Sequence, residues 1–171
     1  PVLRSIHLKD GLVAKFLALL PFSLTNSQQI VLNQIQDDLQ LSKPMSRLLQ
    51  GDVGSGKTLV AISALIKAVE AGWQGALMAP TEVLAQQHYL MLCQWLPQLH
   101  ISVELLTGST SLKDRKRILD DLVAGSLKII VGTHALLEHK ILFARLGLVV
   151  VDEQHRFGVN QRNLLLNKGL N

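Results

Sequence analysis

The sequence predicts an α/β fold with an open, mostly parallel β-sheet that is flanked by helices on both faces. Strand-like and helix-like segments alternate from Pro21 onward, and this alternation is typical of parallel strands joined by right-handed crossovers. Residues 146–151 form an apolar run without polar alternation, as expected for a central strand that is buried on both faces. The hydrophobic content of 48% and the mean hydropathy of +0.28 fit a sheet that is covered on both sides.

Four helices are predicted in this alternating part of the chain. They are expected over residues 27–39, 57–71, 83–96 and 112–123. The first has apolar residues at helical spacing, and Thr25 or Asn26 is its candidate N-cap. Gly72 closes the second helix, Pro97 stops the third, and Gly125 ends the fourth, which is rich in charged residues.

Five strands are expected between these helices. They span residues 47–50, 76–79, 101–106, 128–131 and 146–151. The second strand is apolar throughout, the third alternates between apolar and polar residues, and the last two are rich in β-branched residues. We therefore expect right-handed crossovers that join these strands into an open parallel sheet.

Residues 1–20 differ from the rest of the chain. Asp10 and Gly11 are a turn signal, and apolar residues then recur at helical spacing up to Pro21. We expect a tail or linker helix over residues 1–20, with an apolar face that packs elsewhere, on another domain. Residues 21–171 are expected to form one domain.

Composition limits the classes of protein to be considered. The sequence contains no run of about 18 uncharged apolar residues, so no transmembrane helix is predicted. Residues 1–20 lack the pattern of a signal peptide. The single cysteine, Cys93, excludes an internal disulfide and suits a reducing cytosol. The net charge of +4 and the pI of about 9.4 permit contact with a nucleic-acid backbone without establishing it.

A phosphate-binding motif lies between the first strand and the second helix. Residues 51–58 read Gly-Asp-Val-Gly-Ser-Gly-Lys-Thr, which fits GxxxxGK[ST] in its required strand–loop–helix context. Glycines allow a tight turn whose N–H groups bind an anion, and the helix N-terminus adds partial positive charge. We expect Lys57 to reach the β- and γ-phosphates of ATP and the Thr58 hydroxyl to bind Mg²⁺. The candidate nucleotide-binding residues of this motif are Gly51, Gly54, Ser55, Gly56, Lys57 and Thr58.

Two adjacent carboxylates, Asp152 and Glu153, follow the apolar strand 146–151. In an open α/β sheet, ligands bind beyond the carboxyl ends of the strands. Asp152 is expected to hold Mg²⁺ through water, and Glu153 to orient or deprotonate the attacking water. Together with the phosphate motif, the pair predicts an ATP-hydrolysing site.

The residues that follow the carboxylates extend this pattern. Asp-Glu-Gln-His at 152–155 resembles the DExH box of superfamily 2 helicases, and residues 156–162 narrow the resemblance. With the motifs at 51–58, 79–88 and 132–137, residues 21–171 resemble the RecG family of bacterial ATP-dependent DNA helicases, which remodel branched DNA. The transcription-repair coupling translocase is the nearest alternative, but it usually lacks a glutamine at the position of Gln154.

The resemblance implies a RecA-like first motor lobe and assigns further roles at the nucleotide. Gln28 matches the glutamine of the Q motif, whose amide reads the adenine edge. Phe22 is a candidate to stack on the adenine ring, with a core or linker contact as the alternative. His155 is implied to couple the nucleotide state to a second lobe. The candidate catalytic residues are Lys57, Asp152, Glu153 and His155.

The resemblance also implies three DNA-facing loops, each of which follows a strand. Their candidate DNA-binding residues are Pro80, Thr81, Thr107, Gly108, Thr133 and His134. Thr81 is a candidate N-cap, and the free N–H groups of a helix start suit a phosphate. Such Gly and Thr pairs are also common turn formers. Gln86, Gln87 and His88 are interpreted as solvent-facing or packing residues, and the charged helix 112–123 as a solvated face.

The family pattern implies parts beyond these residues. It implies a second RecA-like lobe with an arginine finger, an N-terminal DNA-binding domain, and branched or forked DNA as the partner in recombination and repair. We expect a monomeric, cytoplasmic, nucleoid-associated protein with no membrane partner, whose isolated lobe is nearly inactive. The alternatives left open are a lobe of a double-stranded DNA translocase of the transcription-repair coupling type, a small-molecule P-loop phosphotransferase, and a folded lobe that binds no nucleotide.

Overall fold

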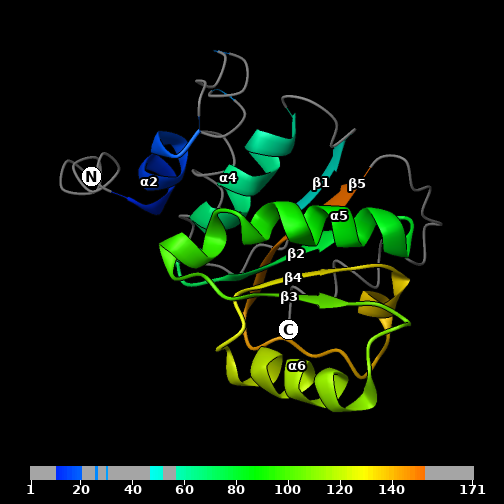
Figure 1. Ribbon diagram of the computed structural model, residues 1–171. Coiled ribbons are helices and arrows are strands. Elements are labelled where there is room, and N and C mark those ends of the chain that lie inside the picture. The colour runs from blue at the N-terminus through cyan, green and yellow to red at the C-terminus, as the bar shows by residue number, and fades with distance from the viewer. Residues whose placement is uncertain (1–10, 21–25, 27–29, 31–46, 52–56, 153–171) are drawn as a thin grey trace.

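A computed structural model describes residues 11–20, 26, 30, 47–51 and 57–152 of the chain. Its centre is a five-stranded sheet in the order β1-β5-β2-β4-β3, and every pair of neighbouring strands is parallel (Figure 1). The strands are β1 Arg47–Gly51, β2 Gln74–Met78, β3 Val103–Leu106, β4 Ile129–Gly132 and β5 Leu146–Asp152. This arrangement confirms the predicted α/β fold.

Helices cover both faces of the sheet. They are α2 Leu12–Ala18, α4 Lys57–Glu70, α5 Glu82–Cys93 and α6 Leu112–Ala124, with short 3-10 turns η1 Leu96–Leu99 and η2 His134–Leu137. Figure 1 shows α2, α4 and α5 on one side of the sheet and α6 on the other. None of these helices is long and apolar enough to cross a membrane. The predicted helix 27–39 lies outside the described residues, apart from Ile30, which is helical and exposed.

Alternate residues of the central strands build two separate apolar cores. Leu77 and Val150 pack with α2, α4 and α5, whereas Met78 and Val151 pack with α6. The burial of every residue of β5 explains its unbroken apolar run, because a strand between two helical layers has no solvent-facing side.

Strand β5 contains an extra residue near its start. Gln74 pairs with Leu146 and Gly75 pairs with Leu148, so Gly147 is bypassed in the register. A Cβ at Gly147 would lie 2.6 Å from the Cβ of Trp73, and only glycine fits there without a shift. The bulge explains why Leu146 and Leu148, two residues apart, belong to opposite cores.

Most predicted boundaries differ from the structure by one to three residues, and two of these differences have a clear physical reason. Strand β2 begins at Gln74, two residues before the predicted start, because the polar side chain of Gln74 is accommodated in the core by hydrogen bonds. Its Nε2 donates to the carbonyls of Leu122 and Leu127, and its Oε1 accepts from the backbone N–H of Arg145. Helix α5 ends at Cys93 rather than residue 96. A separate turn, η1, then begins with a proline in its first turn, where the missing N–H costs nothing.

Helix α2 is part of this lobe, and the expectation that its apolar face packs on another domain is wrong. Phe16 is 0% exposed and meets the ring of Trp95 edge-on, with 5.5 Å between ring centroids. Leu12 N–H donates to the Glu70 carboxylate of α4 at 3.0 Å. The apolar periodicity therefore predicted the helix correctly, but periodicity alone carries no information about which surface it covers.

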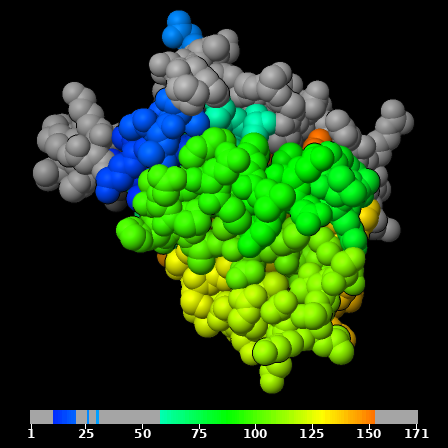
Figure 2. Space-filling model, in the orientation of Figure 1, coloured from blue at the N-terminus to red at the C-terminus, as the bar shows by residue number. Residues whose placement is uncertain are grey.

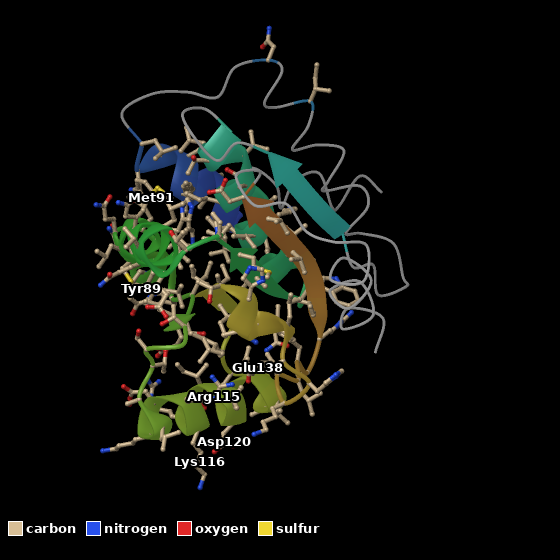
Figure 3. The ribbon with its side chains drawn as sticks, turned by 90° about the vertical axis from the view of Figure 1, so that its right-hand side faces the viewer. Tyr89, Met91, Arg115, Lys116, Asp120 and Glu138 are labelled. Atoms are coloured by element: carbon tan, nitrogen blue, oxygen red, sulfur yellow. The ribbon has the colours of Figure 1, made fainter. Side chains whose placement is uncertain are left out.

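The charged helix α6 presents a solvated outer face, as expected. Its inner side is Ile118 and Leu122, both 1% exposed, whereas Lys116 lies on the side away from the sheet (Figure 3). Arg115 pairs with Glu138, and Arg117 pairs with Glu104 at 2.7 Å. Exposed pairs of this kind contribute little stability, so the inner apolar face holds α6 in place.

We expect Phe16→Ala to lower the free energy of unfolding by about 3–5 kcal/mol, because it empties a fully buried ring site between α2 and Trp95. Urea unfolding followed by circular dichroism measures this loss. Leu19→Ala is the matched control, since Leu19 is 41% exposed just after the same helix. Equal stability of the two variants would contradict the packing of α2 on this lobe.

Tyr89 provides a spectroscopic test of the α5 packing, because it is the single tyrosine of the chain. Burial, followed by a hydrogen bond with Cys93, raises the pKa of Tyr89 to about 12. The unfolded chain releases this proton near the ordinary pKa of about 10, so this contribution to stability is present below about pH 10 and is lost as pH rises towards 12. We expect little tyrosinate absorbance at about pH 11 until urea is added. Coincident titrations with and without urea would show that the partly buried phenol of Tyr89 is not shielded in the folded protein.

Candidate nucleotide and DNA-binding site

The two halves of the predicted nucleotide site begin on neighbouring strands. Strands β1 and β5 are parallel, and Gly51 at the end of β1 is the register partner of Asp152 at the end of β5. The first residue of the phosphate motif and the candidate metal carboxylate therefore meet at one edge of the sheet. This is the carboxyl edge, where open α/β sheets bind their ligands.

Helix α4 starts at the lysine of the phosphate motif. Lys57 is its first residue and Thr58, which is half-buried, its second, so both lie where the helix has partial positive charge and free N–H groups. A run of α4 residues from Leu59 to Ala68 is buried against the sheet, which fixes the position of this N-terminus. The remaining predicted nucleotide and catalytic residues, Phe22, Gln28, Gly54, Ser55, Gly56, Glu153 and His155, lie outside the described residues.

Asp152 is a buried carboxylate, 4% exposed. It is the last residue of β5, and the alternation along the strand places it on the face of Val150, which is the face covered by α4 and α5. A carboxylate oxygen and a threonine hydroxyl are the hard oxygen ligands that Mg²⁺ prefers, and Mg²⁺ takes its other ligands from water and phosphates. The donor set of Asp152 and Thr58 therefore fits a nucleotide-bound Mg²⁺.

One neighbour of Asp152 was missed by the sequence analysis. The Nε2 atom of His88, on α5, lies 3.3 Å from Oδ2 of Asp152, so His88 belongs to the metal end of the site. A carboxylate can only accept, so this contact places a proton on Nε2. The signal in the sequence was the spacing of Ala85, His88 and Leu92, which puts His88 on the inward face of α5.

The candidate DNA-binding residues follow three neighbouring strands at the same edge. Their loops follow β2, β3 and β4, which lie side by side in the order β2-β4-β3. Thr81, Gly108 and His134 are exposed, and Pro80 is half-buried. Thr107 and Thr133 are only 5% and 9% exposed, so their side chains lie below the surface that a DNA backbone could touch.

Two of these loops are shaped by internal hydrogen bonds. The Thr81 hydroxyl accepts from Leu84 N–H, which confirms it as the N-cap of α5. The Thr107 hydroxyl accepts from Ser109 N–H and so forms a local turn, which was the alternative weighed for this loop. The Ser109 hydroxyl donates to the carboxylate of Glu82 at 2.7 Å and thereby joins the loops after β2 and β3.

A cleft of about 550 Å³ opens below these loops, between α5 and α6 and over the edge strand β3. The two helices form adjacent parts of one face of the molecule (Figure 2). Glu82, Glu104 and Asp114 line the cleft, with Arg117 as the cation among its lining residues. A lining with three carboxylates and one guanidinium repels a phosphate backbone, so the interior of the cleft does not suit nucleic acid.

Comparisons with known proteins agree with this geometry. The RecG helicase of Synechocystis sp. is 57% identical over 158 residues, which are 92% of this chain and 19% of that protein. The RecG helicase of Acidithiobacillus ferridurans is 51% identical over 169 residues, which are 99% of this chain and 24% of that protein. The chain therefore spans about a fifth to a quarter of the length of these relatives.

A solved structure of RecG bound to a three-way DNA junction superposes with a TM-score of 0.76 at 46% sequence identity, over 86% of this chain and 20% of that one. Residues 25–170 match the model of the DEAD/DEAH box helicase family. This match covers most of the chain and includes both the phosphate motif and the buried carboxylate of β5. The chain belongs to the DEAD/DEAH box helicase family.

Proposed function

We propose that this chain is the ATP-binding motor lobe of an ATP-dependent DNA helicase that remodels branched DNA, such as forks and junctions, in recombination and repair. The observation that carries the proposal is the register of Gly51 with Asp152, which brings the phosphate motif and a buried carboxylate to one point of the sheet edge. Relatives that are about half identical to this chain are named ATP-dependent DNA helicases, which supports ATP as the nucleotide.

Three groups of residues have different roles in the proposed nucleotide site. Lys57 and the N–H groups of the phosphate motif bind the β- and γ-phosphates. The amide of Gln28 hydrogen-bonds to the adenine edge, and Phe22 stacks on the adenine ring. Thr58 and Asp152 hold Mg²⁺, which supplies charge neutralisation at the phosphates when it is bound. Glu153 orients the attacking water, and His155 passes the nucleotide state to the second lobe.

We propose that DNA meets the loops after β2, β3 and β4. Exposure favours Thr81, Gly108 and His134 as the contacting residues, and the free N–H groups at the start of α5 suit a phosphate. The side chains of Thr107 and Thr133 are buried, so we assign them a role in shaping their loops and not in contacting DNA. Because a RecG protein that is 46% identical to this chain was solved bound to a three-way DNA junction, branched DNA is favoured over the duplex that a coupling translocase follows.

The parent protein would supply the parts that these residues do not contain. A second RecA-like lobe would bring an arginine finger to the γ-phosphate, and a further domain would recognise the DNA branch. The chain covers 20% of the RecG protein solved on a three-way junction, which leaves room for both. We propose a monomeric cytoplasmic protein, in keeping with the single cysteine of the sequence.

A protein of these 171 residues is expected to bind a fluorescent ADP or ATP analogue in the presence of Mg²⁺. Lys57→Ala should weaken this binding about 10-fold or more, because it removes a charged hydrogen-bond donor from the phosphates. Fluorescence anisotropy measures both affinities. Lys113→Ala, an exposed change on α6, is the control for lost positive charge. Binding that is insensitive to Lys57 would refute the assigned phosphate site.

The same protein is expected to hydrolyse ATP slowly, with or without DNA, because an arginine finger supplied by a partner element contributes about 10³–10⁵ in rate. A coupled phosphate-release assay measures the turnover, and adding the second lobe should raise it. Rapid DNA-stimulated turnover by the lobe alone would mean that the transition-state charge is stabilised by a residue within it.

A further inference from the structure

His88 occupies a position for which the proposed ATPase site has no assigned role. Its side chain is 11% exposed, that of Asp152 is 5% exposed, and Nε2 lies 3.3 Å from Oδ2. His88 lies on the inward face of α5, between Ala85 and Leu92, which are both 0% exposed. The imidazole therefore reaches the carboxylate from a helix that is fixed against the sheet.

We propose that His88 is a positioning residue for the metal site: it orients the Asp152 carboxylate for Mg²⁺ and ties that orientation to helix α5. The inference rests on the proposed function, because it presumes that Asp152 serves a nucleotide-bound metal. The contact between Nε2 and Oδ2 restrains the rotation of the Asp152 carboxylate and so sets the direction in which its oxygens face. Carboxylates that serve metals are commonly held by such a partner, and its loss typically costs 10- to 100-fold in metal affinity or activity.

The location of His88 on α5 gives this contact a second consequence. Helix α5 starts at its N-cap Thr81, in a loop that is a candidate DNA contact. Seven residues separate Thr81 from His88, so about 10 Å of helix joins the two. His88 thus provides a direct path from the DNA-facing edge to the metal carboxylate.

Mn²⁺ binding with ADP tests the positioning role without relying on turnover. Electron paramagnetic resonance reports the free Mn²⁺ in the presence of ADP and each variant. His88→Leu keeps an apolar body without a donor, His88→Asn carries an amide that is too short, and His88→Gln carries an amide that reaches the same place. Gln87→Leu, on the exposed side of α5, is the matched control.

We expect His88→Leu and His88→Asn to weaken Mn²⁺ binding about 10- to 100-fold, while His88→Gln and Gln87→Leu stay close to the wild-type protein. Circular dichroism tests whether each variant is folded. If His88→Leu does not fold, the comparison of His88→Asn with His88→Gln still tests the positioning role. In an Asp152→Asn background, His88→Leu should add no further loss, because its effect runs through that carboxylate.

Three results would overturn the inference. One is wild-type Mn²⁺ affinity in both His88→Leu and His88→Asn. Another is an equal loss in the Gln and Asn variants, because only the Gln amide reaches the Asp152 carboxylate. The third is full additivity with Asp152→Asn. Failure of the proposed function has a different signature: the wild-type protein itself would bind no Mn²⁺–ADP, and Lys57→Ala would change nothing.

Discussion

The site depends on the register of β5, a strand that is buried along its whole length between β1 and β2. In a strand, a shift of one residue moves every side chain to the opposite face. The bypassed Gly147 makes such a shift near the start of β5, and from Leu148 onward the alternation is regular. Asp152 consequently faces α4 and α5, beside Gly51 and His88, and not the side of α6.

This register also fixes the backbone position of Asp152 at the nucleotide end of the sheet. The pairing of Gly51 with Asp152 closes a ladder of five partner pairs between β1 and β5, and β5 is paired on its other side with β2. Helix α4 then packs its buried face onto the same strands. The backbone of Asp152 is held by its pairing with Gly51, so the freedom that remains to its carboxylate is rotation of the side chain. The imidazole of His88 is placed where it restrains that rotation.

Much of this fold could be predicted from local sequence patterns, because strand and helix periods and the GxxxxGK[ST] motif are local properties. The packing of Phe16 and the contact of His88 could not, because both depend on which surfaces meet across the chain. The burial of Thr107 and Thr133 was missed for a related reason. A Gly-Thr pair at a strand end has the same composition whether its hydroxyl faces solvent or closes a turn.

The strand order sorts the carboxyl edge into two regions with different chemistry. The phosphate motif and Asp152 end β1 and β5, on one side of the sheet, while the three candidate DNA loops follow β2, β4 and β3 on the other. Strand β2 borders β5 directly, and the helix that follows it, α5, is the one that carries His88. Because Glu82 joins the loop of β2 to that of β3 through Ser109, these two loops are linked to each other as well as to α5. A displacement at either of these two loops therefore has a short covalent and hydrogen-bonded route to the carboxylate through α5 and His88, and that route does not pass through the sheet.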